Sequence, residues 1–200
     1  MTTYSFPSIT PTSSSWELVS NVGVHRSPLS GATQTLDRGG EFWRCRLNFS
    51  NLNGADAATM RAFLVKLNGQ QHRFTVHDHG QTQRGSFGGS ALVRGGSQTG
   101  TSINIDGMTA SVSNWIRAGD HFSIDGHLKI ATADFDSDGS SRIDNLTFAP
   151  RIVTAPANNA AVTTTNPTCT FMLESSQVGW SKRRGDFSDF TIIGIEDVLA

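Results

Sequence analysis

One segment of this chain has the periodicity of a helix, and it limits the fold more than any other feature. In residues 51–69 (NLNGADAATMRAFLVKLNG), four apolar residues recur at helical spacing, with Phe63 beside them: Ala57, Met60, Leu64 and Leu67. Asn53 is placed to cap the start of a helix over residues 54–67, and Asn68-Gly69 supplies a left-handed end. Because the other segments lack this pattern, a chain of 200 residues has to build its core mainly from strands.

The segments on both sides of the helix alternate between apolar and polar residues, as half-buried strands do. Residues 41–52 place four residues on the face expected to be buried: Trp43, Cys45, Leu47 and Phe49. Residues 71–80 predict a second strand, and earlier strands are expected at 15–21 and 22–27. Serine and threonine number 44, while the helix formers Glu and Lys number only four and three. The sequence therefore predicts a mainly β protein with one α-helix.

The distribution of glycine divides the chain. Seven of the twenty glycines lie in residues 80–100, which indicates loops or a loosely bonded hairpin. Short β-like runs follow, and residues 116–135 are typical of a small barrel, with an Asp-Gly hairpin turn. A second change occurs at 154–167, which is small, polar and flanked by proline, as a linker is. We therefore expect one β domain made of residues 1–80 plus 156–200, interrupted by an all-β, barrel-like insertion at 81–155.

Composition excludes several classes of protein. Sixteen basic residues against seventeen acidic ones give a net charge of −1, without the positive charge that direct nucleic-acid recognition requires. No window approaches the roughly 20 apolar residues of a membrane span, so no membrane insertion is expected. Residues 1–19 have no basic region and no apolar region, so they are not expected to act as a signal peptide. The two cysteines lie far apart in the chain, which excludes a disulfide framework. Unpaired buried thiols are favoured over a single Cys45–Cys169 bridge.

Two clusters are weak candidates for binding a metal ion. Asp134, Asp136 and Asp138 match the first half of a calcium loop, but Asn145 stands where a bidentate Glu is needed, so an Asp-rich turn is favoured. His77 and His79 share one face of a strand and could chelate zinc or nickel, but nothing in the sequence brings a third ligand near. No cofactor is therefore expected, and a metal-dependent enzyme or sensor is the least favoured hypothesis.

No arrangement of residues predicts catalysis. The glycine clusters lack a phosphate-binding lysine, and there is no G-x-S-x-G nucleophile turn. The chain is therefore not expected to be an enzyme. One basic run is a candidate protein interface, because arginine next to tryptophan is typical of interface hot spots, although it also fits a solvated hairpin turn. Its residues are Trp180, Lys182, Arg183 and Arg184.

The order of motifs along nearly the whole chain resembles a known family. The motifs are W-x-L (Trp16–Leu18), G-x-x-W-x-x-x-L-x-F (Gly40–Phe49), D-x-x-x-M-R-A-F-L-x-x-L-N-G (Asp56–Gly69), A-G-D-x-F-x-I (Ala118–Ile124), A-P-R-I-V (Ala149–Val153) and F-x-L…W…F-x-I…E-D (Phe171–Asp197). In this order they resemble the distal tail protein, or a closely related minor tail protein, of the tail tip of long-tailed bacteriophages (siphophages).

This resemblance implies a tail-tube-like β-sandwich domain whose copies form a hexameric ring. The ring joins the tail tube to the baseplate hub, so the implied partners are further copies of the chain, the tail-tube protein, the hub and other tail-tip proteins. The implied location is the tail tip of the virion, after synthesis in the host cytoplasm, and no catalytic residues carry over. Two alternatives remain open: docking of a carbohydrate or a receptor-binding protein through the insertion, and a tail-tube or terminator subunit.

Overall fold

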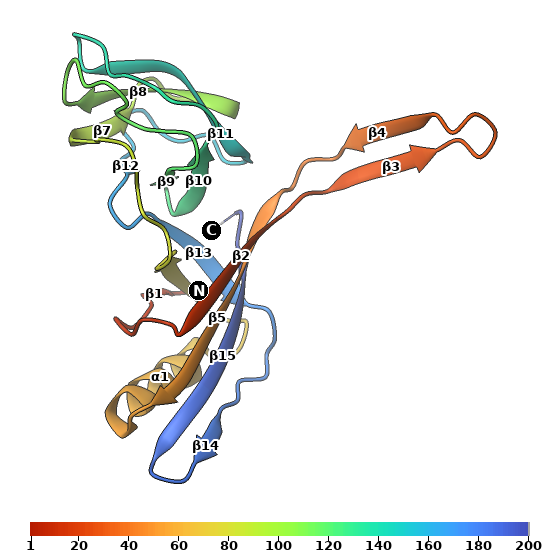
Figure 1. Ribbon diagram of the computed structural model, residues 1–200, viewed down its shortest axis with the longest axis vertical. Coiled ribbons are helices and arrows are strands. Elements are labelled where there is room, and N and C mark those ends of the chain that lie inside the picture. Colours follow the sequence, from red (N-terminus) through yellow and green to blue (C-terminus); the bar gives the residue numbers. More distant parts are fainter. Residues whose placement is uncertain (200) are drawn as a thin grey trace.

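The computed structural model describes residues 1–199 and is mainly β, with one helix (Figure 1). The elements in chain order are β1 (Thr3–Ser5), β2 (Ser13–Val19), β3 (Val22–Arg26), β4 (Thr33–Asp37), β5 (Phe42–Leu52), α1 (Gly54–Leu67), β6 (Arg73–His77), β7 (Gly89–Val93), β8 (Gly100–Met108), β9 (His121–Ile124), β10 (His127–Ala131), β11 (Arg142–Ile152), β12 (Val162–Thr163), β13 (Thr168–Leu173), β14 (Ser181–Arg183) and β15 (Phe187–Glu196). Within residues 1–199 no helix is both long enough and apolar enough to cross a bilayer.

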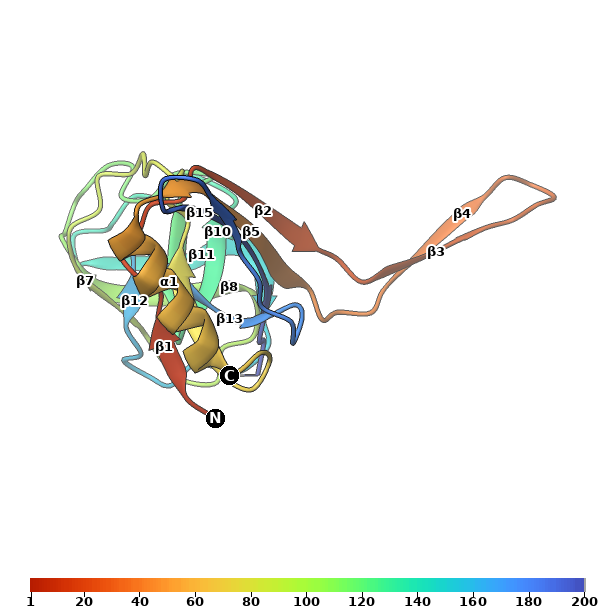
Figure 2. The same ribbon diagram turned by 90° about the horizontal axis from the view of Figure 1, so that it is seen from below.

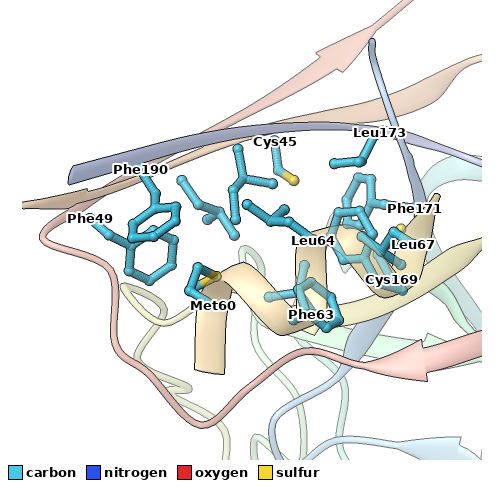
Figure 3. Close-up of a cluster of buried hydrophobic side chains, with 14 of the residues drawn as sticks. Cys45, Phe49, Met60, Phe63, Leu64, Leu67, Cys169, Phe171, Leu173 and Phe190 are labelled. Carbon is cyan, nitrogen blue, oxygen red and sulfur yellow. The ribbon is translucent and has the colours of Figure 1, made fainter. Parts of the chain in front are cut away.

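The main sheet joins both ends of the chain. Its strand order is β1-β6-β13-β15-β5-β2, and β14 pairs with the start of β15. Helix α1 lies across one face of this sheet (Figure 2). The alternation predicted for β5 is confirmed, because Trp43, Cys45, Leu47 and Phe49 are all buried. Figure 3 shows side chains of β5, α1, β13 and β15 meeting in the resulting core.

The helix has the bounds and the caps that the sequence predicts. Asn53 accepts a hydrogen bond from the Asp56 amide through its side chain, and Asn68 ends the helix in the left-handed conformation. The predicted inner face is confirmed, including the neighbouring Phe63: Ala57, Met60, Phe63, Leu64 and Leu67 are buried.

A second sheet curls into a barrel-like body with its own core. Its strand order is β12-β9-β10-β11-β8-β7. An isolated bridge between Leu92 and Ala161 links the two edge strands, so the barrel is nearly closed. The predicted mainly β fold with a barrel-like sheet is confirmed. The insertion was expected to end at residue 155. Strand β12 lies beyond that residue and still belongs to the barrel, since it pairs with β9.

The barrel is fixed to the main sheet through β10. Leu128 of this strand is buried in the core of the main sheet, and not in the core of the barrel. Its carbonyl oxygen accepts a hydrogen bond of 3.0 Å from the indole N–H of Trp43. The two bodies therefore share a hydrophobic contact and meet along a definite seam.

Strands β3 and β4 form a hairpin that projects away from both bodies (Figures 1 and 2). They pair only with each other, and they continue the ribbon made by β2 and β5. A strand was expected at 22–27, but a projecting hairpin was not. We refer to residues 22–37 as the arm.

Candidate functional site

The structure brings the two candidate histidines together. The rings of His77 and His79 lie with their centroids 4.0 Å apart, at the end of β6. Burial lowers the pKa of His79, and the neighbouring His77 adds to this effect. Within residues 1–199, no group of three or more His, Cys, Asp or Glu side chains is placed to hold a metal ion. In the described part of the chain, the two imidazoles therefore have no third side chain beside them with which to bind a metal ion.

The three aspartates of the predicted turn accept hydrogen bonds from backbone amides. Asp134 accepts a hydrogen bond from the amide of Ala118, and Asp136 accepts one from Asn114. Asp138 accepts bonds from the amides of Ser140 and Arg142 with one carboxylate oxygen, at 2.8 Å each. These carboxylates therefore fasten three different loop contacts of the barrel, which accounts for their concentration in one segment.

Both cysteines are free and buried, so the bridge kept open as an alternative does not form. Burial raises the pKa of the Cys45 thiol to about 12. Burial also raises the pKa of the Cys169 thiol. Since the thiolate is the reactive form, both residues act as small apolar side chains of the core.

The predicted basic run lies on an exposed hairpin formed by β14 and β15. Lys182, Arg183 and Arg184 are all exposed. The amide of Asn51 donates a hydrogen bond to Asp189 and lowers the pKa of that carboxyl, and the ion pair with Arg183 at 2.7 Å adds to this effect. Trp180 is partly exposed on the same hairpin. The structure therefore places these residues on one exposed hairpin, at the end of the main sheet away from the barrel (Figure 1).

The arm is the least covered part of the molecule. Its four large apolar side chains are exposed: Val22, Val24, Leu29 and Leu36. Val22 and Val24 lie on one face of the ribbon, whereas Leu36 lies on the other, opposite Gly23. Leu29 stands at the tip with 98% of its surface exposed. Between residues 22 and 36 the ionisable side chains are His25 and Arg26, so this outer part of the arm carries one fixed positive charge, and the acidic Asp37 stands at its base.

The base of the arm is anchored to the barrel. Asp37, at the end of β4, forms an ion pair with Arg151 of β11. The amide of Arg38 donates a 3.1 Å hydrogen bond to the carbonyl of Asn21, which closes the ribbon at its base. Gly39 and Gly40 follow with φ angles of 68° and 75°, values that favour glycine. The direction of the arm is therefore set by a turn that glycine permits and by a contact with the barrel.

A cavity of about 60 Å³ lies at the seam, beside the base of the arm. Strands β9 to β11 and the segment after them line one side, and Glu41, Glu196 and Val198 line the other. Glu196 is buried, accepts a hydrogen bond from the Trp43 amide at 2.9 Å, and lies 3.1 Å from Nδ1 of His127. Lys129 is also buried and donates to the carbonyl of Arg151 at 2.9 Å. Burial lowers the pKa of Lys129.

A scan against protein-family models and a search of curated proteins both find no match to this chain. Its function must therefore be inferred from its own surface.

The arm and the seam cavity are the features that sequence reasoning missed. The signal for the arm was present, because two short β-like runs, VGVHR and TQTLD, flank a turn containing Pro28 and Gly31. No comparable signal marks the cavity, since its lining comes from segments between Glu41 and Val198 that meet only in the folded chain.

Proposed function

We propose that this protein is a structural subunit of a phage tail tip, whose copies form a ring that joins the tail tube to the baseplate hub. The observation that carries the proposal is the arm, which leaves the body and exposes apolar side chains on both of its faces. The order of sequence motifs supports the same function. In this role the protein works through assembly and performs no catalysis.

The arm has little to hold it in shape when the chain is alone. A two-stranded ribbon is marginally stable in water, because it lacks a hydrophobic face covered by other elements. Val24 is 66% exposed although it lies within a strand. A surface of another molecule that covered Val22 and Val24 would remove this apolar area from water. The arm is thus built as one half of an intermolecular contact.

Identical copies are the partner that the proposal favours. An arm that contacts a different surface on the next copy makes a heterologous contact, and repetition of such a contact closes into a ring when the rotation between copies is right. The main sheet also ends at β2, whose outer edge has no strand partner within residues 1–199. An open edge of this kind is a common site for association between chains.

The test is the oligomeric state of the purified chain, measured by light scattering and negative-stain imaging. We expect a closed oligomer with rotational symmetry. Replacing residues 23–36 by an Asn-Gly turn keeps the Arg38–Asn21 hydrogen bond at the base of the arm, and should give a folded monomer. Val24→Ser should weaken assembly without lowering the melting temperature of the monomer.

The matched control is Val65→Ser. Val65 is 63% exposed on helix α1, so this change removes a similar apolar side chain from a different surface. Assembly that is unaffected by Val65→Ser and lost in the arm variants supports the proposal. A chain that stays monomeric at high concentration, both alone and with a tail-tube protein, contradicts it.

A further inference from the structure

We infer that the tip of the arm inserts Leu29 into the seam cavity of the next copy in the assembly. This inference rests on the proposed function, and it names the surface that receives the arm. Leu29 is exposed at the tip of the arm, and the seam cavity is partly lined by apolar side chains; neither contacts the other within one molecule.

Leu29, the apolar side chain at the tip of the arm, is not covered by its own chain. Leu29 is 98% exposed, and both views show the tip pointing away from the barrel and the main sheet. The tip is ordered by its own hydrogen bonds, because the Ser27 amide donates to the carbonyl of Ala32 at 2.8 Å and the Gly31 amide donates to the carbonyl of Ser27 at 2.9 Å. Leu29 is therefore presented on a defined turn, which reduces the entropy lost on binding.

The cavity has a suitable size and lining. Its volume of about 60 Å³ exceeds the roughly 10–15 Å³ that one water molecule needs by the same measure, so it has room for the end of an apolar side chain. A leucine side chain ends in two methyl groups. Six apolar residues contribute to the lining: Ile124, Pro150, Ile152, Val153, Pro156 and Val198. Val153 is 44% exposed at this site, so part of the apolar lining is open to solvent.

The charges on the two surfaces are complementary. Arg26 lies three residues from Leu29 and is exposed, and the arm has no acidic residue between 22 and 36. The ionisable lining has three carboxylates (Asp125, Glu41 and Glu196) and two cations (Lys129 and Arg151), which leaves an excess of one negative charge when His127 is neutral. Arg26 of an inserted arm would face these carboxylates. Complementary charges of this kind mainly set the register and the rate of association.

The position of the cavity also suits a ring. Glu41 and Arg151 line the cavity, and the same Arg151 pairs with Asp37 at the base of the arm. The cavity of each copy thus lies at the root of that copy's own arm. The arm reaches about 23 Å from Val22 to Leu29, at roughly 3.3 Å per residue. Tip-to-root contacts therefore repeat from copy to copy, which is the heterologous pattern that closes into a ring.

The experiment is a disulfide between copies. Leu29→Cys and Val153→Cys are combined in the full chain, which is then oxidised mildly and run on a non-reducing gel. The native thiols do not interfere, because Cys45 and Cys169 are buried. We expect a ladder of covalent multimers from the double variant, and covalent dimers when the two single variants are mixed. The matched control pairs Leu29→Cys with Val65→Cys, which is exposed on α1 and should give no ladder.

A second measurement does not depend on a cross-link. Leu29→Ser should raise the concentration needed for half-assembly about tenfold or more, as the loss of a central anchor does. If the chain assembles but forms no Leu29–Val153 ladder, or if Leu29→Ser assembles normally, this inference is wrong and the ring proposal stands. If the unaltered chain does not assemble under any condition, both fail. A ladder of equal strength in the Val65 control also overturns the inference.

Discussion

Leu128 is expected to hold the barrel and the main sheet together, and Leu128→Ala tests this directly. Leu128 is fully buried in the core of the main sheet although it belongs to β10 of the barrel. Truncation to alanine removes three carbon groups, worth about 2.4 kcal/mol at roughly 0.8 kcal/mol for each. A residual cavity of about 50 Å³ adds about 1.2 kcal/mol at roughly 24 cal/mol per Å³. The expected loss in the free energy of unfolding is therefore about 3.6 kcal/mol.

The assay is scanning calorimetry at a fixed protein concentration, because assembly would otherwise shift the apparent stability. We expect the unaltered chain to unfold in one cooperative transition, and Leu128→Ala to separate the unfolding of the barrel from that of the main sheet. The matched control is Leu146→Ala, since Leu146 is equally buried but lies in the core of the barrel itself. The control should lose similar stability. A loss under about 1 kcal/mol, or a splitting that is just as large in the control, would refute the role of Leu128 at the seam.

Three further predictions concern the core and the ionisable groups. Leu64→Ala on the buried face of α1 should cost about 2–5 kcal/mol in urea unfolding, and a loss under about 1 kcal/mol would mean that its packing is misjudged. Cys45 and Cys169 should not react with a thiol reagent at pH 8 until the chain unfolds, because burial raises the pKa of both thiols; rapid labelling of the native chain would contradict this. Burial lowers the pKa of His121 below its usual 6.5, so the unfolded chain takes up this proton first as the pH falls. Stability should therefore decrease as the pH falls through 6.5 towards the lower native pKa, and the decrease between pH 7 and pH 5 should be smaller in His121→Gln, as measured by melting temperature.

The helix was predictable because everything that specifies it is local. The periodicity, the cap at Asn53 and the left-handed end at Asn68 all lie within one short segment, and the structure uses each of them. The burial of β5 was predictable for the same reason, since alternation along a strand identifies its inner face. The barrel was predicted as a class of structure, but its last strand was not, because β12 has only two residues and is specified by pairing across the barrel with β9.

The geometry of the candidate sites was predictable from the sequence only where their contacts are local. Asp134 and Asp138 have the spacing of metal ligands, yet their oxygens bond backbone amides. Asp134 reaches Ala118 in another loop, a partner that spacing alone does not reveal, whereas Asp138 bonds Ser140 within its own turn. His77 and His79 were correctly placed side by side because they are two residues apart on one segment. The arm was missed because an apolar residue in a short strand, such as Val24, usually indicates a face buried by the same chain. The structure leaves Val24 66% exposed, and no local signal in the sequence marks this difference.

Strands β2 and β5 continue into β3 and β4 as one two-stranded ribbon. The half made of β2 and β5 belongs to the folded core, and the half made of β3 and β4 is exposed. Where β5 lies between β2 and β15, every apolar residue on its inner face is covered by the chain itself. In the arm, residues 22–37, no other element covers the ribbon, and its large apolar side chains are exposed to solvent. The change occurs at the turn where Arg151 of the barrel pairs with Asp37. Besides the seam around Leu128, the barrel thus contacts the chain at the turn that helps to set the direction of the arm. In the proposed function, this placement gives the insertion a role in setting the direction of the arm.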